Sequence, residues 1–174
     1  SRWWLHHSLT SLARDIEQLG GRLIFQKGPA QACLEALIED VGADAVFWNR
    51  QYEPWARKRD EAIKSALKTA DVKARSFNGS LIVEPWDIAT KAGAPYKVFT
   101  PFWRSLKAGH APSEPSDRPD ALTFQDYKGG CALEALKLLP TKPDWSGGLD
   151  DNWTPGEAAA HGRLGQFLQH SVTA

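Results

Sequence analysis

The stretch AVFWNRQYEP, residues 45–54, decides the fold. Its first four residues form a continuous apolar run of strand length, which is typical of a parallel strand buried on both faces. A polar loop follows, and Pro54 suits the first turn of a helix, where its missing amide hydrogen is not needed. We therefore predict a helix over residues 54–69. A second strand is predicted over residues 72–77, ending at the turn Asn78-Gly79.

Two further helices and a strand are predicted on the amino-terminal side of this stretch. The first helix has an apolar face with spacings of four, three, four and three, made by Leu5, Leu9, Leu12, Ile16 and Leu19. The pair Gly20-Gly21 ends it, as glycine commonly does past a last turn. Residues 22–26 (RLIFQ) predict a short strand. Pro29 then begins a helix that Gly42 ends.

The alternation of helices and strands predicts an α/β fold class, with a Rossmann-like three-layer parallel sheet. Three strands make a thin sheet, and the first helix has no strand before it. We therefore expect the sheet to be incomplete at its amino-terminal end. The sequence begins without methionine and contains none, which favours a piece of a longer protein.

An extended interdomain segment is predicted after Leu81, where the regular rhythm breaks. It contains short helices over residues 101–107 and 131–139. Thr154 is predicted to cap a last helix, with Pro155 at its first position and Glu157 three residues after the cap.

Three regions follow from this pattern. An α/β domain covers residues 1–107, a linker rich in proline and glycine covers 108–152, and the start of a helical domain covers 153–174.

Composition excludes several classes of protein. The formal net charge is zero, with 42% hydrophobic and 24% charged residues, which is typical of a soluble globular domain and argues against a wholly basic nucleic-acid binder. The two cysteines, Cys33 and Cys131, form neither a metal pattern nor a disulfide framework, so a cytoplasmic location is expected. No apolar run is long enough to span a membrane. Most of the eight tryptophans are interpreted as packing residues.

No familiar catalytic pattern is present, so no catalytic residue is predicted. The sequence lacks a Walker loop, a dinucleotide fingerprint and a nucleophile elbow. His6 and His7 are adjacent, so on a helix they point about 100° apart and do not form an obvious metal pair. The charge run from Arg57 to Glu61 is interpreted as the solvated face of its helix.

Several local phrases stand in a distinctive order along the whole chain. They are WWLHHSL (3–9), WNRQYEP (48–54), FNGSL (77–81), EPW (84–86), YKVFTPFWR (96–104) and WTPGEA (153–158). This series closely resembles the amino-terminal half of the photolyase and cryptochrome family. The family's first strand and almost all of its helical domain are missing from the sequence.

The resemblance implies that the whole protein is a light-driven, FAD-dependent DNA photolyase, which splits pyrimidine dimers. FAD and damaged DNA would bind the helical domain, and the whole protein is expected to be a monomer. The α/β domain would hold an antenna pigment, either a folate or a deazaflavin. A cryptochrome, which is a photoreceptor without repair activity, is the alternative within the family. A free-standing nucleotide-binding α/β module is the alternative outside it.

The resemblance also implies one site residue, Glu53, since folate-binding members use the matching glutamate to hydrogen-bond the pterin. The position agrees, because Glu53 lies beyond the carboxyl end of a predicted parallel strand, where ligands of open α/β sheets bind. Its carboxylate can accept two hydrogen bonds from an aminopyrimidine edge. The alternative is an acid favoured by the helix dipole at the start of the helix. Asn49 and Tyr52 are weaker candidates for the same antenna-pigment site.

Overall fold

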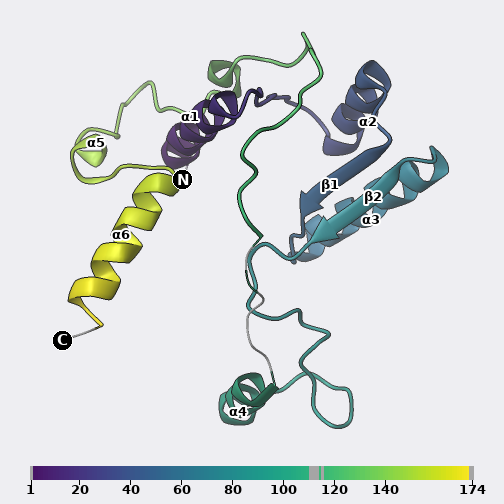
Figure 1. Ribbon diagram of the computed structural model, residues 1–174, viewed down its shortest axis with the longest axis vertical. Coiled ribbons are helices and arrows are strands. Elements are labelled where there is room, and N and C mark those ends of the chain that lie inside the picture. The colour runs from purple at the N-terminus through teal and green to yellow at the C-terminus, as the bar shows by residue number, and fades with distance from the viewer. Residues whose placement is uncertain (1, 110–113, 115, 173–174) are drawn as a thin grey trace. The chain divides into compact units, whose positions relative to one another are not determined.

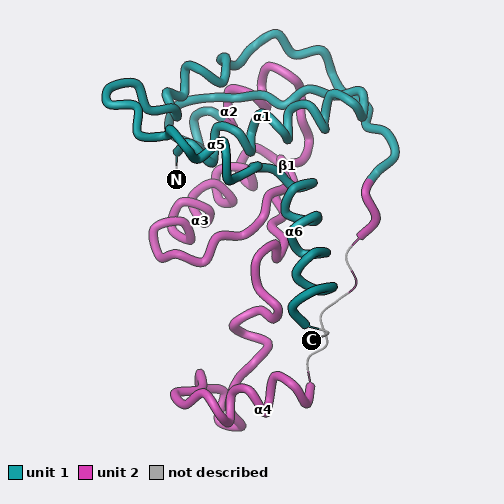
Figure 2. The backbone as a smooth tube through the Cα atoms, turned by 90° about the vertical axis from the view of Figure 1, so that its left-hand side faces the viewer, with its two compact units in different colours: residues 1–33, 119–174 teal, residues 34–118 magenta. Residues whose placement is uncertain are grey.

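The computed structural model describes residues 2–109, 114 and 116–172, and it divides into two compact units. One unit contains residues 34–118, and the other contains residues 1–33 and 119–174 (Figure 2). Figure 1 shows the helices and strands of each unit. Of the predicted linker, residues 110–113 and 115 lie outside the described residues.

The unit of residues 34–118 is built on two parallel strands with a helix between them in sequence. Strand β1 spans Ala45–Asn49, helix α3 spans Pro54–Thr69, and strand β2 spans Lys73–Phe77. The register pairs Ala45 with Lys73 and Asn49 with Phe77. The ladder continues one step further, because the Arg50 amide donates to the Phe77 carbonyl at 2.8 Å. All three predicted elements are confirmed, to within one residue at their ends.

Helix α3 packs through a stripe of small and apolar residues with one acid among them. The buried positions are spaced four, three and four residues apart, at Ala56, Asp60, Ile63 and Leu67. This corrects the interpretation of residues 57–61 as a wholly solvated face, since Asp60 is only 7% exposed. Its carboxylate accepts hydrogen bonds from the Trp48 indole on β1 and from Arg59, which satisfies the buried charge.

Two more helices flank this strand–helix–strand unit in sequence. Helix α2 spans Ala30–Val41 and ends at Gly42, whose φ of 63° is the left-handed conformation that glycine adopts readily. Helix α4 spans Phe99–Gly109, two residues longer at each end than the predicted helix over 101–107.

The other unit begins with helix α1, Arg2–Gln18, which carries the buried side chain Trp3. Gly20 follows it with φ 89°, and its amide donates to Glu17, so the predicted glycine stop is confirmed. Within the same unit α1 contacts helix α6, which spans Glu157–His170. The Trp4 and Trp153 rings meet edge to face, with centroids 5.7 Å apart.

The structure forms no strand at residues 22–26, so that prediction is wrong. Phe25 forms only an isolated antiparallel bridge with Cys131, and the sheet therefore has two strands. The physical reason is that a later segment of the chain, residues 122–131, returns and hydrogen-bonds to this part of the backbone. The Leu122 amide donates to Leu19, the Cys131 amide donates to Phe25, and Arg22 donates to the Tyr127 carbonyl.

Two helix predictions near the carboxyl end also need correction. The helix predicted over residues 131–139 is a single 3-10 turn, η1 at Leu133–Leu136, closed by Lys137 in the left-handed region. The capping prediction at Thr154 is wrong by two residues, because Gly156 is the N-cap of α6. Its φ of 119° lies outside the helical region, so the helix starts only at Glu157. A further short helix, α5, spans Leu149–Asn152 inside a predicted loop.

Candidate functional site

An open groove lies where β1 and β2 end at their carboxyl termini. Its volume is about 580 Å³, within the range of pockets that take cofactor-sized ligands. The groove brings together all three residues predicted for a pigment site, Asn49, Tyr52 and Glu53. Its other lining residues are Arg50, Gln51, Gly79, Ser80 and Leu81.

One wall of the groove is the turn that follows β2. The Asn78 side-chain oxygen accepts hydrogen bonds from the amides of Ser80 and Leu81, at 3.1 and 2.9 Å, and its nitrogen donates to the Leu81 carbonyl at 2.8 Å. This closes the predicted Asn78-Gly79 turn by side-chain bonding. A Cβ on Gly79 would stand 2.7 Å from Asn49 Cγ. Glycine therefore allows the Asn49 side chain to lie against the turn.

Glu53 stands at the junction between the loop and α3. Its backbone is extended, with φ −61° and ψ 140°, and its carbonyl accepts the first helical hydrogen bond, from the Arg57 amide at 2.9 Å. It is therefore the N-cap residue. Its exposed carboxylate makes no capping hydrogen bond to α3, so both oxygens are open to another donor.

A network of side chains ties the loop between β1 and α3 to the segment after β2. The Glu84 carboxylate accepts hydrogen bonds from two residues of the loop. Its Oε1 pairs with the Arg50 guanidinium, and its Oε2 accepts a hydrogen bond from the Tyr52 hydroxyl at 2.7 Å. Arg50 also donates to the Ser76 carbonyl at 2.9 Å, and its guanidinium lies 5.0 Å from the centre of the Trp86 ring. These groups hold the loop against the end of β2.

The same network shifts the pKa of one side chain, Tyr52. Partial burial raises the pKa of the Tyr52 hydroxyl above 10.0, and the hydrogen bond to the Glu84 carboxylate raises it further, while Arg50 opposes the shift. Neither Arg50 nor Glu84 was singled out from the sequence. The available signal was their place in the phrases WNRQYEP and EPW, which contain both residues.

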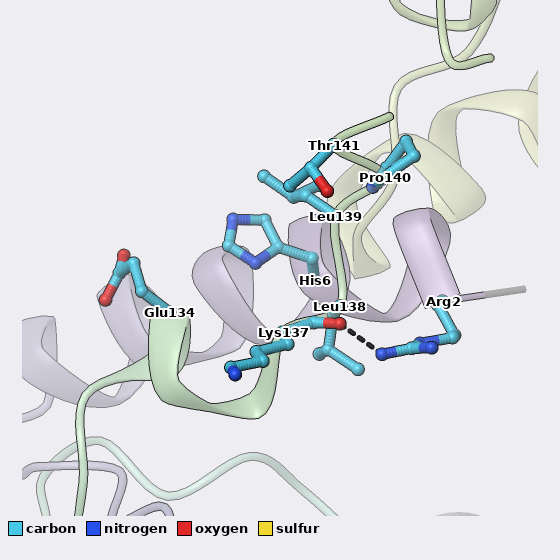
Figure 3. Close-up of a pocket in the computed structure, with 8 residues that line it drawn as sticks. All are labelled: Arg2, His6, Glu134, Lys137, Leu138, Leu139, Pro140 and Thr141. Atoms are coloured by element: carbon cyan, nitrogen blue, oxygen red, sulfur yellow. Dashed lines mark hydrogen bonds between the residues drawn. The ribbon is translucent and has the colours of Figure 1, made fainter. Parts of the chain in front are cut away.

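The other unit contains a cavity of about 600 Å³, lined by parts of α1 and η1 and by the segment after η1 (Figure 3). Figure 3 shows the Arg2 guanidinium turned toward the Lys137 carbonyl, to which it donates, and the Glu134 carboxylate on the opposite side of His6. Side chains of opposite charge line this cavity, together with the apolar residues Leu138, Leu139 and Pro140. We place the candidate site at the groove instead, because strand ends and the predicted residues coincide there.

Neither a metal site nor a membrane span is present among the residues that the structure describes. There, no group of three or more His, Cys, Asp and Glu side chains is arranged to hold a metal ion. Within residues 2–109, 114 and 116–172, no helix combines the length and the apolar character that a membrane span requires.

A parallel strand–helix–strand unit is characteristic of an α/β domain, and ligands of such domains commonly bind at the strand ends. The comparisons with known proteins give the family. A family model described as DNA photolyase matches residues 1–120, and the chain belongs to that family.

Individual relatives agree with this assignment. The chain is 45% identical to the deoxyribodipyrimidine photo-lyase of Agrobacterium fabrum, over 98% of the chain and 36% of the relative. It is 33% identical to cryptochrome-1 of Arabidopsis thaliana, over 85% of the chain and 24% of that relative. The chain therefore spans about a third, or less, of the length of these relatives.

Solved structures show the same fold. The crystal structure of a bacterial class III photolyase from Agrobacterium tumefaciens matches with a TM-score of 0.90 and 44% identity, covering 97% of this chain and 35% of that one. The structure of a Synechocystis cryptochrome matches with a TM-score of 0.76 at 17% identity, which bears on the fold alone. The predicted α/β fold class is confirmed.

Proposed function

We propose that this chain is the antenna-pigment part of a light-driven, FAD-dependent DNA photolyase that splits pyrimidine dimers. Support comes from family membership and from the 45% identity to a deoxyribodipyrimidine photo-lyase along nearly the whole chain. The division into an α/β domain at 1–107, a linker at 108–152 and the start of a helical domain at 153–174 is part of this proposal. So are the monomeric state and the cytoplasmic location of the whole protein.

The observation that carries the pigment assignment is the exposed Glu53 carboxylate in a groove at the end of a parallel strand. A carboxylate accepts hydrogen bonds only, and two parallel ones suit the amino and ring N–H groups of a pterin. The groove has room for a ring system of that size, and Asn49 adds an amide that both donates and accepts. These residues fit a folate best, and a deazaflavin is the second candidate.

The bound FAD would supply light-driven electron transfer to the pyrimidine dimer. We assign no residue of this chain to it, because the family resemblance places the flavin pocket and the contact with damaged DNA in the helical domain. The role of residues 45–81 is to hold the antenna pigment so that it enlarges light capture. No electron-transfer role is assigned to any tryptophan here.

A cryptochrome is the second candidate, favoured by the 33% identity to cryptochrome-1 of Arabidopsis thaliana. The same groove could serve a photoreceptor without repair activity. A free-standing nucleotide-binding α/β module is set aside, because the chain belongs to the DNA photolyase family.

The test compares the 174-residue chain with the full-length parent protein. We expect the parent to reverse pyrimidine dimers under blue light and to purify with flavin, and the chain alone to do neither. The measurements are flavin absorbance after purification and the loss of dimers from irradiated DNA. A flavin-loaded parent without repair would favour the cryptochrome. Stoichiometric flavin or light-dependent repair by the chain alone would contradict the assignment of these functions to the helical domain.

A further inference from the structure

We propose that Glu84 is a positioning residue for the pigment groove, which fixes the loop before Glu53 by binding Arg50 and Tyr52 together. The inference rests on the proposed pigment function of that groove. It assigns no ligand contact to Glu84 itself.

The loop needs such a device because main-chain hydrogen bonds hold it only at its ends. The Arg50 amide donates to Phe77 at 2.8 Å, and the Glu53 carbonyl accepts from Arg57 at 2.9 Å. Among the described residues, no backbone–backbone hydrogen bond is made by Gln51 or Tyr52 in between. Side chains must therefore set the path of the chain that leads into Glu53.

Glu84 is suited to this task because each oxygen of its carboxylate takes a different partner from the loop. Oε1 pairs with the Arg50 guanidinium, and Oε2 accepts the Tyr52 hydroxyl at 2.7 Å. The Glu84 side chain is only 12% exposed and that of Arg50 25% exposed, so water competes weakly for these bonds. One carboxylate thus fixes two loop residues that flank Gln51.

The bridge is anchored on the sheet at its far side. Arg50 donates to the Ser76 carbonyl of β2 at 2.9 Å and lies over the Trp86 ring. A continuous series of contacts therefore runs from β2 through Arg50 and Glu84 to Tyr52, the residue before Glu53. Loss of the Glu84 charge leaves Arg50 partly buried without its counter-ion and frees the Tyr52 hydroxyl.

This arrangement also changes the role of Tyr52. Its hydroxyl donates its single hydrogen to Glu84, so it has none left for a ligand. Tyr52 lines the groove, and its hydroxyl serves the loop. Tyr52 is therefore a positioning residue as well, and Glu53 is the residue that contacts the pigment.

The experiment is a double-mutant cycle on pigment affinity in the full-length parent protein. Folic acid and a 5-deazaflavin are titrated separately into the wild type, Glu84→Gln, Glu53→Gln and the double variant. Glu84→Gln should weaken binding about tenfold, the usual effect of losing one hydrogen bond to a charged group. In the Glu53→Gln background the same change should alter affinity by less than about twofold, because the contact it positions is already lost. Glu39→Gln, at an exposed glutamate of α2, is the matched control and should leave affinity unchanged.

Additive losses in the cycle would overturn the inference, since Glu84 would then act independently of Glu53. A second measurement separates this result from a failure of the proposed function. Exchange of the Arg50 and Arg57 amide hydrogens, which the main-chain hydrogen bonds at the two ends of the loop protect, should speed up in Glu84→Gln, while exchange at Ile63 and Leu67 of α3 stays unchanged. If the wild type binds neither probe, the pigment function fails, and the exchange pattern still decides whether Glu84 orders the loop. Unchanged exchange of the Arg50 and Arg57 amide hydrogens would overturn the positioning role.

Discussion

The Trp48 indole nitrogen donates a hydrogen bond to Asp60 Oδ2 at 3.0 Å, and this contact joins strand β1 to helix α3. The second oxygen, Oδ1, accepts from Arg59 Nε and Nη2 at 2.9 and 2.7 Å. Arg59 also donates to the Gln51 side chain at 3.0 Å. One buried carboxylate therefore connects the sheet, the helix and the loop that lines the groove at the strand ends.

The first prediction is that Asp60→Ala destabilises the chain by about 2–3 kcal/mol, because it leaves the Trp48 N–H and the Arg59 guanidinium without their acceptor. The matched control is Glu61→Ala, at the exposed neighbouring position of the same helix, which should change stability by less than about 0.5 kcal/mol. Urea denaturation followed by circular dichroism measures both. Equal effects of the two substitutions would show that Asp60 contributes no more to stability than an exposed acidic residue.

Local patterns in the sequence were enough to predict the strand–helix–strand unit, because each of its elements is specified by its own residues. Pro54 and the apolar run before it act within one turn or one strand. The charge run around Asp60 predicts an exposed side chain, whereas its spacing from Ala56 and Ile63 places it on the buried stripe. The spacing was the better signal.

Long-range contacts explain the errors that remain. The strand predicted at residues 22–26 depends on what its backbone meets, and Arg22 bonds Tyr127, 105 residues away. The same limit holds at the candidate site. Asn49 ends β1, and Tyr52 and Glu53 lie in the loop directly after it, so local sequence could place the three together, whereas Arg50 meets Glu84 across 34 residues. No periodic pattern encodes a contact of that kind.

The second prediction concerns Gly79. Gly79→Ala should destabilise the chain by about 1–2 kcal/mol, because the new Cβ would stand 2.7 Å from Asn49 Cγ and 3.1 Å from its Cβ. The displaced Asn49 side chain should also weaken pigment binding in the full-length protein. Gly147→Ala is the control, since a Cβ there meets nothing within 4 Å. Thermal unfolding and pigment titration give the two readouts, and a Gly79→Ala protein that matches the control in both would contradict the tight contact.

The third prediction is a pH dependence at Tyr52. The pKa of its hydroxyl is raised above 10.0 in the folded chain, so the folded state holds this proton more tightly than the unfolded state. The stability that results is fully present below pH 10.0 and is lost as the pH rises through the folded pKa. Tyr52→Phe lacks this contribution and the hydrogen bond to Glu84. The melting temperature of the wild type should exceed that of Tyr52→Phe at neutral pH, and the difference should shrink in alkaline solution. A difference that stays constant across this range would contradict the shifted titration.

The fourth prediction is that Glu53→Gln weakens pigment binding by the full-length protein about tenfold to a hundredfold. The amide replaces one acceptor by a donor that faces the donors of the pterin, and a hydrogen bond to a charged group is worth about 1.5–3 kcal/mol. Repair driven directly through FAD should survive, because the role proposed for the pigment is only to enlarge light capture. Fluorescence titration with a folate measures affinity, and dimer loss under light absorbed by the flavin measures repair.

The alternative role of Glu53 gives a different result in the same experiment. If the carboxylate mainly stabilises the start of α3 through the helix dipole, Glu53→Gln should lower thermal stability by about 0.3–1 kcal/mol and leave pigment affinity unchanged. The structure favours the ligand role, because this carboxylate makes no capping hydrogen bond and lines the groove. Glu61→Gln serves as the control, since it removes an exposed charge from the same helix beyond its first turn. Unchanged pigment affinity in Glu53→Gln, at the stability of the control, would remove Glu53 from the site.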